Sequence, residues 1–364
     1  MKYGIVSYNQ YVNFVNYGSI LQSYALQQAL DKLGIDNTIV DYCCKTMVHA
    51  DKDNPVPLMQ DTDPVALECC VQSLPDIHAV NRKFDLFWDK YCRKTAEKYN
   101  ADNFTDLDFD GYICGSDTIW NIEEFAGFDP GYFADFAEMK GKRNITYSAS
   151  MGDAIFSDDD KKILAEKMNN FTAISLREAR MIDELTSWYG KEIACTVDPT
   201  LLLDQEDYAK LEQNSPLKPK EKYLLLYSRQ YNPDMNDYAD RMAADNGWKI
   251  VDISLRYINK DRHIMAYNTG IEEFLNLLRD AQCVVTNSFH GVIFSMQYRC
   301  PFHAFFRTGT SSKTQFLLDR FGLGQRHVKD SNILLNNDID WNSVWKSVHE
   351  QREDSLAYLR KELL

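Results

Sequence analysis

The feature that most constrains the fold of this chain is the alternation of short apolar runs with longer amphipathic segments. Apolar runs occupy residues 3–7, 109–114 and 283–286, and each leads into a polar turn. An intervening segment, residues 17–30, repeats apolar residues at helical spacing. This alternation predicts βαβ units with mostly parallel sheets. We therefore expect an α/β fold built from doubly wound domains.

A polar stretch at residues 214–220, broken twice by proline, interrupts this pattern, which restarts at residue 223. Its composition is typical of a domain boundary. We predict an N-terminal Rossmann-like domain over 1–213, a C-terminal Rossmann-like domain over 221–338, and a helix over 339–364 that packs on one of them. In two such domains facing across a cleft, ligands bind beyond the carboxyl ends of the strands.

The segment 45–75 departs from this pattern because it carries four prolines, many aspartates and no sustained period. We predict a long irregular loop there, followed by a helix over 81–99. Loops of this length in compact domains are usually functional or mobile.

The composition of the chain limits the kinds of molecule that we expect it to bind. Acidic residues outnumber basic residues 54 to 40, which gives a net charge of −14 and argues against nucleic-acid binding. A local cluster of cations can still bind a small anion. No apolar run is long enough for a membrane span, and the N-terminal segment is too polar for a secretory signal. Nine cysteines without a C-x-x-C pair favour a reduced, cytoplasmic protein with no metal site.

The most informative polar residues follow the predicted strand 283–286. There the chain reads N-S-F-H-G over 287–291, and we expect a helix to begin just after His290. Backbone N–H groups at a helix start favour an anion, and an imidazole there can donate a proton to the bound molecule. Alternatively, His290 caps the helix or satisfies a hydrogen bond in the core.

Two cations also stand near predicted strand ends. Arg177 follows directly on the strand 171–176, and Lys313 lies in the loop after the strand 302–306. A guanidinium can bind a carboxylate or phosphate through two parallel hydrogen bonds. Each of these cations can equally be an ordinary surface charge.

The N-terminal half has two polar turns. The turn at residues 16–19 lacks the G-x-G-x-x-G spacing, and the chain has no P-loop motif, which argues against nicotinamide, flavin and P-loop chemistry. The turn G-S-D-T-I-W-N at 115–121 gathers a carboxylate, hydroxyls and an indole that suit a carbohydrate subsite. The alternative is a tight turn in which Asp117 caps a helix.

Together these segments resemble the polysaccharide pyruvyl transferase family. The resemblance covers most of the chain in order: N-Y-G-S-I-L-Q-S-Y-A-L-Q at 16–27, the helix around 84–91, and then 115–121, Y-S-A-S-M-G at 147–152, S-L-R-E at 175–178, D-P-T-L-L at 198–202 and 287–291. It implies transfer of a pyruvyl unit from phosphoenolpyruvate to a sugar, with formation of a cyclic ketal and release of phosphate. It also implies two Rossmann-like domains facing across a cleft, in a GT-B-like arrangement.

The resemblance further implies site residues. The catalytic residue would be His290, and phosphoenolpyruvate is a co-substrate, with no other cofactor and no metal. The expected donor-binding residues are Arg177, Ser288, His290 and Lys313. The expected acceptor-binding residues are Asn16, Tyr17, Gly18, Ser116, Asp117 and Trp120.

The expected acceptor is a sugar or a lipid-linked oligosaccharide, which leaves room for a peripheral contact with the inner membrane surface. We assign acceptor selection to the loop 45–75. The chain departs from the family pattern at Lys313, where relatives carry arginine, at Asn287, where aspartate is common, and at Thr118-Ile119, where Gln-Val is usual. Two other functions fit the same plan: a nucleotide-sugar glycosyltransferase and a non-catalytic protein that binds a sugar or an anion.

Overall fold

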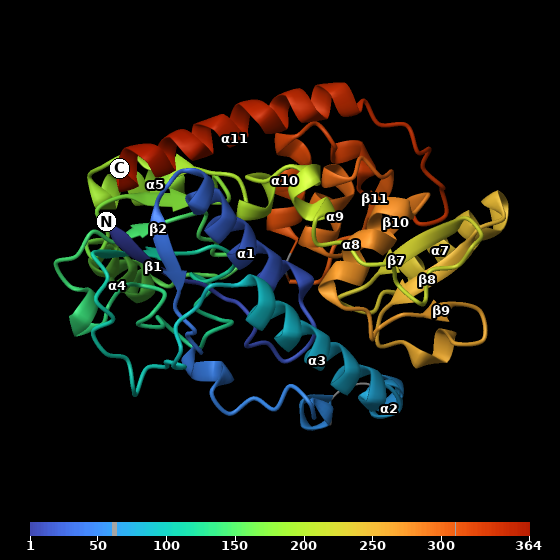
Figure 1. Ribbon diagram of the computed structural model, residues 1–364. Coiled ribbons are helices and arrows are strands. Elements are labelled where there is room, and N and C mark those ends of the chain that lie inside the picture. Colours follow the sequence, from blue (N-terminus) through green and yellow to red (C-terminus); the bar gives the residue numbers. More distant parts are fainter. Residues whose placement is uncertain (60–63, 310) are drawn as a thin grey trace.

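The computed structural model describes residues 1–59, 64–309 and 311–364, and it contains one main parallel sheet in each half of the chain (Figure 1). The first sheet has the order β2 (Asp36–Ile39), β1 (Lys2–Val6), β3 (Gly111–Cys114) and β4 (Ile145–Thr146). Two further parallel strands, β5 (Ile174–Leu176) and β6 (Ile193–Cys195), pair with each other. They continue the first sheet through an isolated bridge between Ile145 and Ala173.

The second sheet has the order β11 (Phe302–Ala304), β10 (Cys283–Thr286), β7 (Tyr223–Tyr227), β8 (Lys249–Ile253) and β9 (Ile264–Met265). All its strand pairs are parallel. The residues of β7 and β10 are buried throughout, as expected when helices cover both faces of a parallel sheet.

Local signals set several helix ends. Ser157 and Asp160 form a capping box at the start of one helix, and Asn232 caps another that begins with Pro233. That second helix stops at Gly247, whose φ of 65° lies in the left-handed region. The helices are α1 (Tyr17–Lys32), α2 (Pro64–Gln72), α3 (Leu74–Tyr91), α4 (Asp158–Met168), α5 (Ile182–Tyr189), α6 (Gln205–Ala209), α7 (Pro233–Asn246), α8 (Ile271–Asp280), α9 (Phe289–Gln297), α10 (Ser312–Arg320) and α11 (Trp341–Leu363).

The predicted fold class is confirmed: the chain is α/β with two doubly wound parallel sheets. In each sheet the strand order reverses direction at one place, between β1 and β3 in the first and between β7 and β10 in the second. Ligands of doubly wound sheets bind at such switch points, beyond the carboxyl ends of the strands. The loops that follow these four strands are therefore where a site is expected.

The prediction of an irregular segment over 45–75 is partly wrong. The segment contains the short 3₁₀ turns η1 (Lys45–Met47) and η2 (Val56–Met59) and the helix α2, while residues 60–63 lie outside the described part. Helix α3 begins at Leu74 rather than at residue 81 and ends at Tyr91 rather than at 99. Two of the four prolines, Pro64 and Pro75, stand in the first turns of these helices, where a missing N–H costs nothing.

The C-terminal helix α11 contacts both halves rather than one (Figure 1). Near its start, Trp345 Nε1 donates to the carbonyl of Met296 in the C-terminal half, at 3.2 Å. Near its end, the Tyr358 hydroxyl donates to the carbonyl of Thr146 in the N-terminal half, at 2.9 Å. Within the described ranges, no helix is both long and apolar enough to span a membrane.

Candidate active site

A cavity of about 390 Å³ lies between the two halves, at the switch points of both sheets. Its walls come from the loops after β1, β3, β7, β10 and β11, together with the start of α10. Its lining residues include Asn16, Asp117, Thr118, Glu123, Glu124, Arg229, Ser288, Phe289, His290, Arg307 and Lys313. Since neither half forms this cavity alone, any reaction in it needs both.

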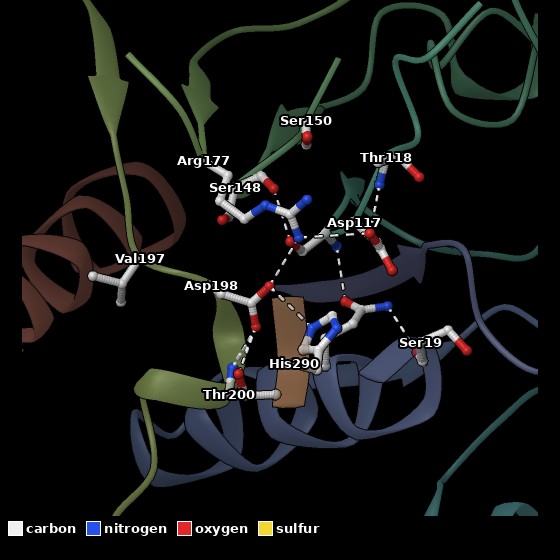
Figure 2. A network of polar contacts seen from close by, with 12 residues as sticks. Ser19, Asp117, Thr118, Ser148, Ser150, Arg177, Val197, Asp198, Thr200 and His290 are labelled. Atoms are coloured by element: carbon white, nitrogen blue, oxygen red, sulfur yellow. Dashed lines mark hydrogen bonds and ion pairs between the residues drawn. The ribbon is translucent and has the colours of Figure 1, made fainter. Parts of the chain in front are cut away.

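Arg177 lies beside this cavity within a cluster of carboxylates (Figure 2). Its Nη1 is 3.0 Å from Asp198 Oδ2 and 3.5 Å from Asp117 Oδ1, and its Nε donates to Glu178 Oε1 at 2.9 Å. The guanidinium Cζ also lies 4.3 Å from the ring centroid of Phe289, a residue that does line the cavity. Its Nη2 is buried and has no hydrogen-bond partner among the described residues. Arg177 therefore holds its neighbours in place, while its Nη2 forms no hydrogen bond with the described residues.

Asp198 joins the arginine to the histidine. One of its oxygens, Oδ1, accepts hydrogen bonds from the backbone N–H and the hydroxyl of Thr200, at 3.0 and 2.6 Å. The other, Oδ2, lies 3.0 Å from Arg177 Nη1 and 3.4 Å from His290 Nε2. The carboxylate is completely buried, so its position is fixed by these contacts (Figure 2).

His290 is the second residue of α9, so this helix begins earlier than predicted. The Ser288 hydroxyl caps the helix by accepting a hydrogen bond from the backbone N–H of Gly291, at 3.2 Å. The imidazole packs against Gly18 in the first turn of α1, where an added Cβ would stand 1.8 Å from Nδ1 of the ring. Only glycine at position 18 therefore allows this close approach.

Two buried carboxyl groups of the cluster are held ionised. Burial opposes ionisation of Asp117, but the positive charge of Arg177, followed by that of Lys313, outweighs burial and lowers the pKa of its carboxyl. Burial likewise opposes ionisation of Asp198, and there His290 and Arg177 lower the pKa. The site thus contains ionised carboxylates next to an imidazole.

Three cationic side chains line the cavity itself: Arg229, Arg307 and Lys313. Lys313 Nζ lies 5.9 Å from the ring centroid of Phe289, on which Arg177 also packs. In the described part of the chain, no three His, Cys, Asp or Glu side chains are placed to share a metal ion. The three cationic side chains suit an anionic ligand.

The predicted donor-binding residues come together: Ser288, His290 and Lys313 line the cavity, and Arg177 contacts two of its lining residues, Asp117 and Phe289. Of the predicted acceptor-binding residues, Asn16 and Asp117 line it. Their roles toward donor and acceptor stay predictions.

Three acceptor residues need correction. The Trp120 ring is fully buried against Phe133, with centroids 5.3 Å apart, so the prediction that it stacks on a sugar is wrong. The Ser116 hydroxyl is also buried, and it donates to the carbonyl of Ser148 at 2.7 Å. Tyr17 stacks on Phe274 and its hydroxyl donates to the carbonyl of Thr269, at 2.7 Å.

Tyr17 instead lines a neighbouring cavity of about 540 Å³, whose walls are mostly apolar and aromatic. This second cavity lies at the carboxyl ends of β7 and β8, and Arg229 lines both cavities. Gly18 lies in the active site, where the absence of a side chain provides room for the His290 ring rather than a contact with an acceptor.

Asp198, Arg229 and Arg307 belong to the site but were not predicted from the sequence. Asp198 appeared only within a family motif, and neither arginine was singled out. The signal was available, because each residue follows an apolar run of the sequence within two positions. That is the criterion which selected Arg177.

Comparison with solved structures shows the same fold. The UDP-GlcNAc 2-epimerase of Methanocaldococcus jannaschii matches with a TM-score of 0.51 and 11% identity, over 96% of this chain and 92% of that one. The enzyme of the same name from Neisseria meningitidis, bound to UDP-GlcNAc, gives a TM-score of 0.47 and 11% identity, over 100% of this chain and 94% of that one. At 11% identity, the likeness to the Methanocaldococcus jannaschii enzyme concerns the fold alone, a GT-B-like pair of domains.

A comparison with curated proteins found no match. The family model of polysaccharide pyruvyl transferases matches residues 16–305, a range that contains the site residues named above except Arg307 and Lys313. The family's name points to a transferase that acts on polysaccharide. With the cavity, the histidine and this match in agreement, the chain belongs to the polysaccharide pyruvyl transferase family.

Proposed function

We propose that this protein transfers a pyruvyl group from phosphoenolpyruvate to a sugar of a surface polysaccharide or of its lipid-linked precursor. The products are a cyclic pyruvate ketal and phosphate. The observation that carries the proposal is the cavity shared by both halves, in which His290 and cationic side chains face carboxylates, in a chain of this family. Phosphoenolpyruvate is a cytoplasmic metabolite, so we place the enzyme in the cytoplasm.

His290 is the proposed general acid. Protonation of the methylene carbon of phosphoenolpyruvate leaves an oxocarbenium-like C2, which a sugar hydroxyl attacks. Asp198 orients the imidazole from 3.4 Å, and Gly18 supports the opposite part of the ring. Fixing the ring in this way reduces the reorganisation that proton transfer requires.

The remaining groups bind and orient. Lys313 offers positive charge to the donor, and the unused Nη2 of Arg177 supports a contact with the donor's carboxylate. Asp117 is ionised and lines the cavity, so it is suited to accept the proton of the attacking hydroxyl. Asn16 lines the same cavity and orients the acceptor. A second hydroxyl of the same sugar then attacks C2, the bond from C2 to the phosphate oxygen breaks, and the leaving phosphate takes the proton of that hydroxyl, which closes the ketal.

The test is an assay of phosphate release and of ketal mass, with phosphoenolpyruvate and a panel of sugar acceptors. We expect His290→Ala to lower turnover by roughly 10²- to 10⁴-fold, the usual effect of losing a general acid. The matched control is His349→Ala, which removes an exposed imidazole on α11. Near-normal turnover of the His290 variant would show that the acid is assigned wrongly.

A thermal-shift comparison separates this proposal from the two other functions that fit the fold. Stabilisation by phosphoenolpyruvate, with phosphate release, supports pyruvyl transfer. Stabilisation by nucleotide sugars alone would identify a glycosyltransferase. Stabilisation by phosphoenolpyruvate without phosphate release from any acceptor would identify a binding protein.

A further inference from the structure

The cations that line the active-site cavity lack carboxylate partners. Among the described residues, Arg229, Arg307 and Lys313 form no ion pair, whereas Arg177 nearby has three carboxylates around it. This is unexpected in a chain with a net charge of −14, where acidic side chains are plentiful. All three side chains are half-buried, so water compensates their charge only in part.

The carboxylates that line the same cavity form their contacts with other residues. Glu124 accepts a hydrogen bond from the Thr118 hydroxyl at 2.8 Å, and Glu123 accepts one from the backbone N–H of Ile155 at 3.0 Å. Asp117 lies next to Arg177. These contacts hold the acidic groups to the N-terminal half, while the three unpaired cations belong to the C-terminal half.

The two arginines follow the strands on either side of β10, the strand that leads into the helix of His290. The strand order β11-β10-β7 places Arg307, after β11, on one side of β10 and Arg229, after β7, on the other. Burial lowers the pKa of Arg307, and the charge of Arg229 lowers it further, so the two guanidinium groups repel each other. Arg229 is nevertheless held in place, because its backbone N–H donates to Asn287 Oδ1 at 2.8 Å and its Nη1 donates to the carbonyl of Val15.

We propose that Arg229 and Arg307, with Lys313, form a binding site for the phosphate group of a small phosphate monoester. The naming of this ester as the donor rests on the proposed function. A phosphate dianion needs cations whose charge is not already neutralised, and these three residues meet that condition. Arg177 does not meet this condition, because Asp117, Glu178 and Asp198 already neutralise its charge.

Titration calorimetry with inorganic phosphate tests the site on the full chain. We expect Arg229→Gln and Arg307→Gln each to weaken phosphate binding by roughly ten- to hundredfold, the value of a charge-assisted hydrogen bond. The matched control is Arg256→Gln, since Arg256 stacks on Tyr231 in the neighbouring cavity and should leave phosphate affinity unchanged. Phosphate affinity equal to wild type in both variants would overturn the site.

Charge-conserving variants distinguish the loss of a positive charge from a general loss of folding. Arg229→Lys and Arg307→Lys keep the positive charge, so both should retain phosphate binding within about tenfold of wild type.

Kinetics with phosphoenolpyruvate separate the proposed phosphate site from the proposed function. A wild-type protein that binds phosphate through these arginines but never consumes phosphoenolpyruvate keeps the site and refutes pyruvyl transfer. If both glutamine variants turn over phosphoenolpyruvate with an unchanged KM, pyruvyl transfer is supported and the phosphate site is refuted.

Discussion

At the scale of single residues, the site depends on one buried carboxylate that serves three partners. Asp198 contacts Arg177, His290 and Thr200, and the two long-range contacts, with Arg177 and His290, cannot be inferred from spacing in the sequence. Its position just after an apolar run is visible in the sequence, as are the positions of Arg229 and Arg307. The direction in which a side chain points cannot be read from the sequence. The prediction for Trp120 was wrong for this reason, because the sequence of a turn does not show which of its side chains pack into the core.

The low pKa of Asp198 predicts a particular dependence of stability on pH. An unfolded aspartate has a pKa of about 3.9, so the stabilisation from the ionised folded form is complete well above that value and is lost as the pH falls toward the lower folded pKa. Between pH 6 and pH 3, wild type should therefore lose about 1 kcal/mol more unfolding free energy than Asp198→Asn. Urea unfolding at the two pH values measures the difference, and equal losses would contradict it.

At the scale of elements, α1 shows what a hydrophobic pattern leaves out. The pattern predicts one apolar face, yet polar residues on the other face are buried as well, among them Ser19, Gln22 and Ser23. Gln22 explains why: its Nε2 donates to the carbonyl of Tyr8, and its Oε1 accepts from the backbone N–H of Ser116. The helix therefore supports the loops that follow β1 and β3.

The first turn of α1 also predicts an effect of Gly18→Ala on turnover. Alanine normally stabilises a helix by about 1 kcal/mol relative to glycine, but the new Cβ would overlap the His290 ring. We expect turnover to fall by roughly a hundredfold, as is usual when a catalytic group is displaced by about 1 Å. Steady-state kinetics and urea unfolding measure both effects. Gln28→Ala, on the same helix, is the control, and full activity of the Gly18 variant would refute the contact.

The accuracy of the predicted elements followed the strength of their local signals. The bounds of β10 agree with the predicted range 283–286. Helix α10 was missed, because a loop rich in glycine, serine and threonine leads directly into it. Helix α9 begins two residues early, since the cap is the Ser288 hydroxyl and His290 lies inside the first turn.

At the scale of the whole molecule, the site exists only because two sheets present their switch points to the same cavity. Asp117 and Arg177 belong to the N-terminal half, whereas His290 and Lys313 belong to the C-terminal half. No pattern within either half predicts how they meet. The chain fixes this arrangement partly through α11, which begins on one half and ends on the other, beside the N-terminal strand (Figure 1).

This role of α11 predicts that a residue far from the cavity affects substrate binding. Arg352 is buried in the middle of α11 and donates from Nε to the carbonyl of Leu201, at 2.6 Å, and from Nη2 to that of Leu203, at 2.9 Å. Arg352→Met leaves these carbonyls unpaired, so unfolding free energy should fall by about 2–4 kcal/mol. KM for phosphoenolpyruvate should rise because the halves are held less firmly. Lys346→Met removes an exposed cation from the same helix and should change neither quantity. A destabilised Arg352 variant with wild-type KM would show that α11 stabilises the chain without positioning the two halves of the site.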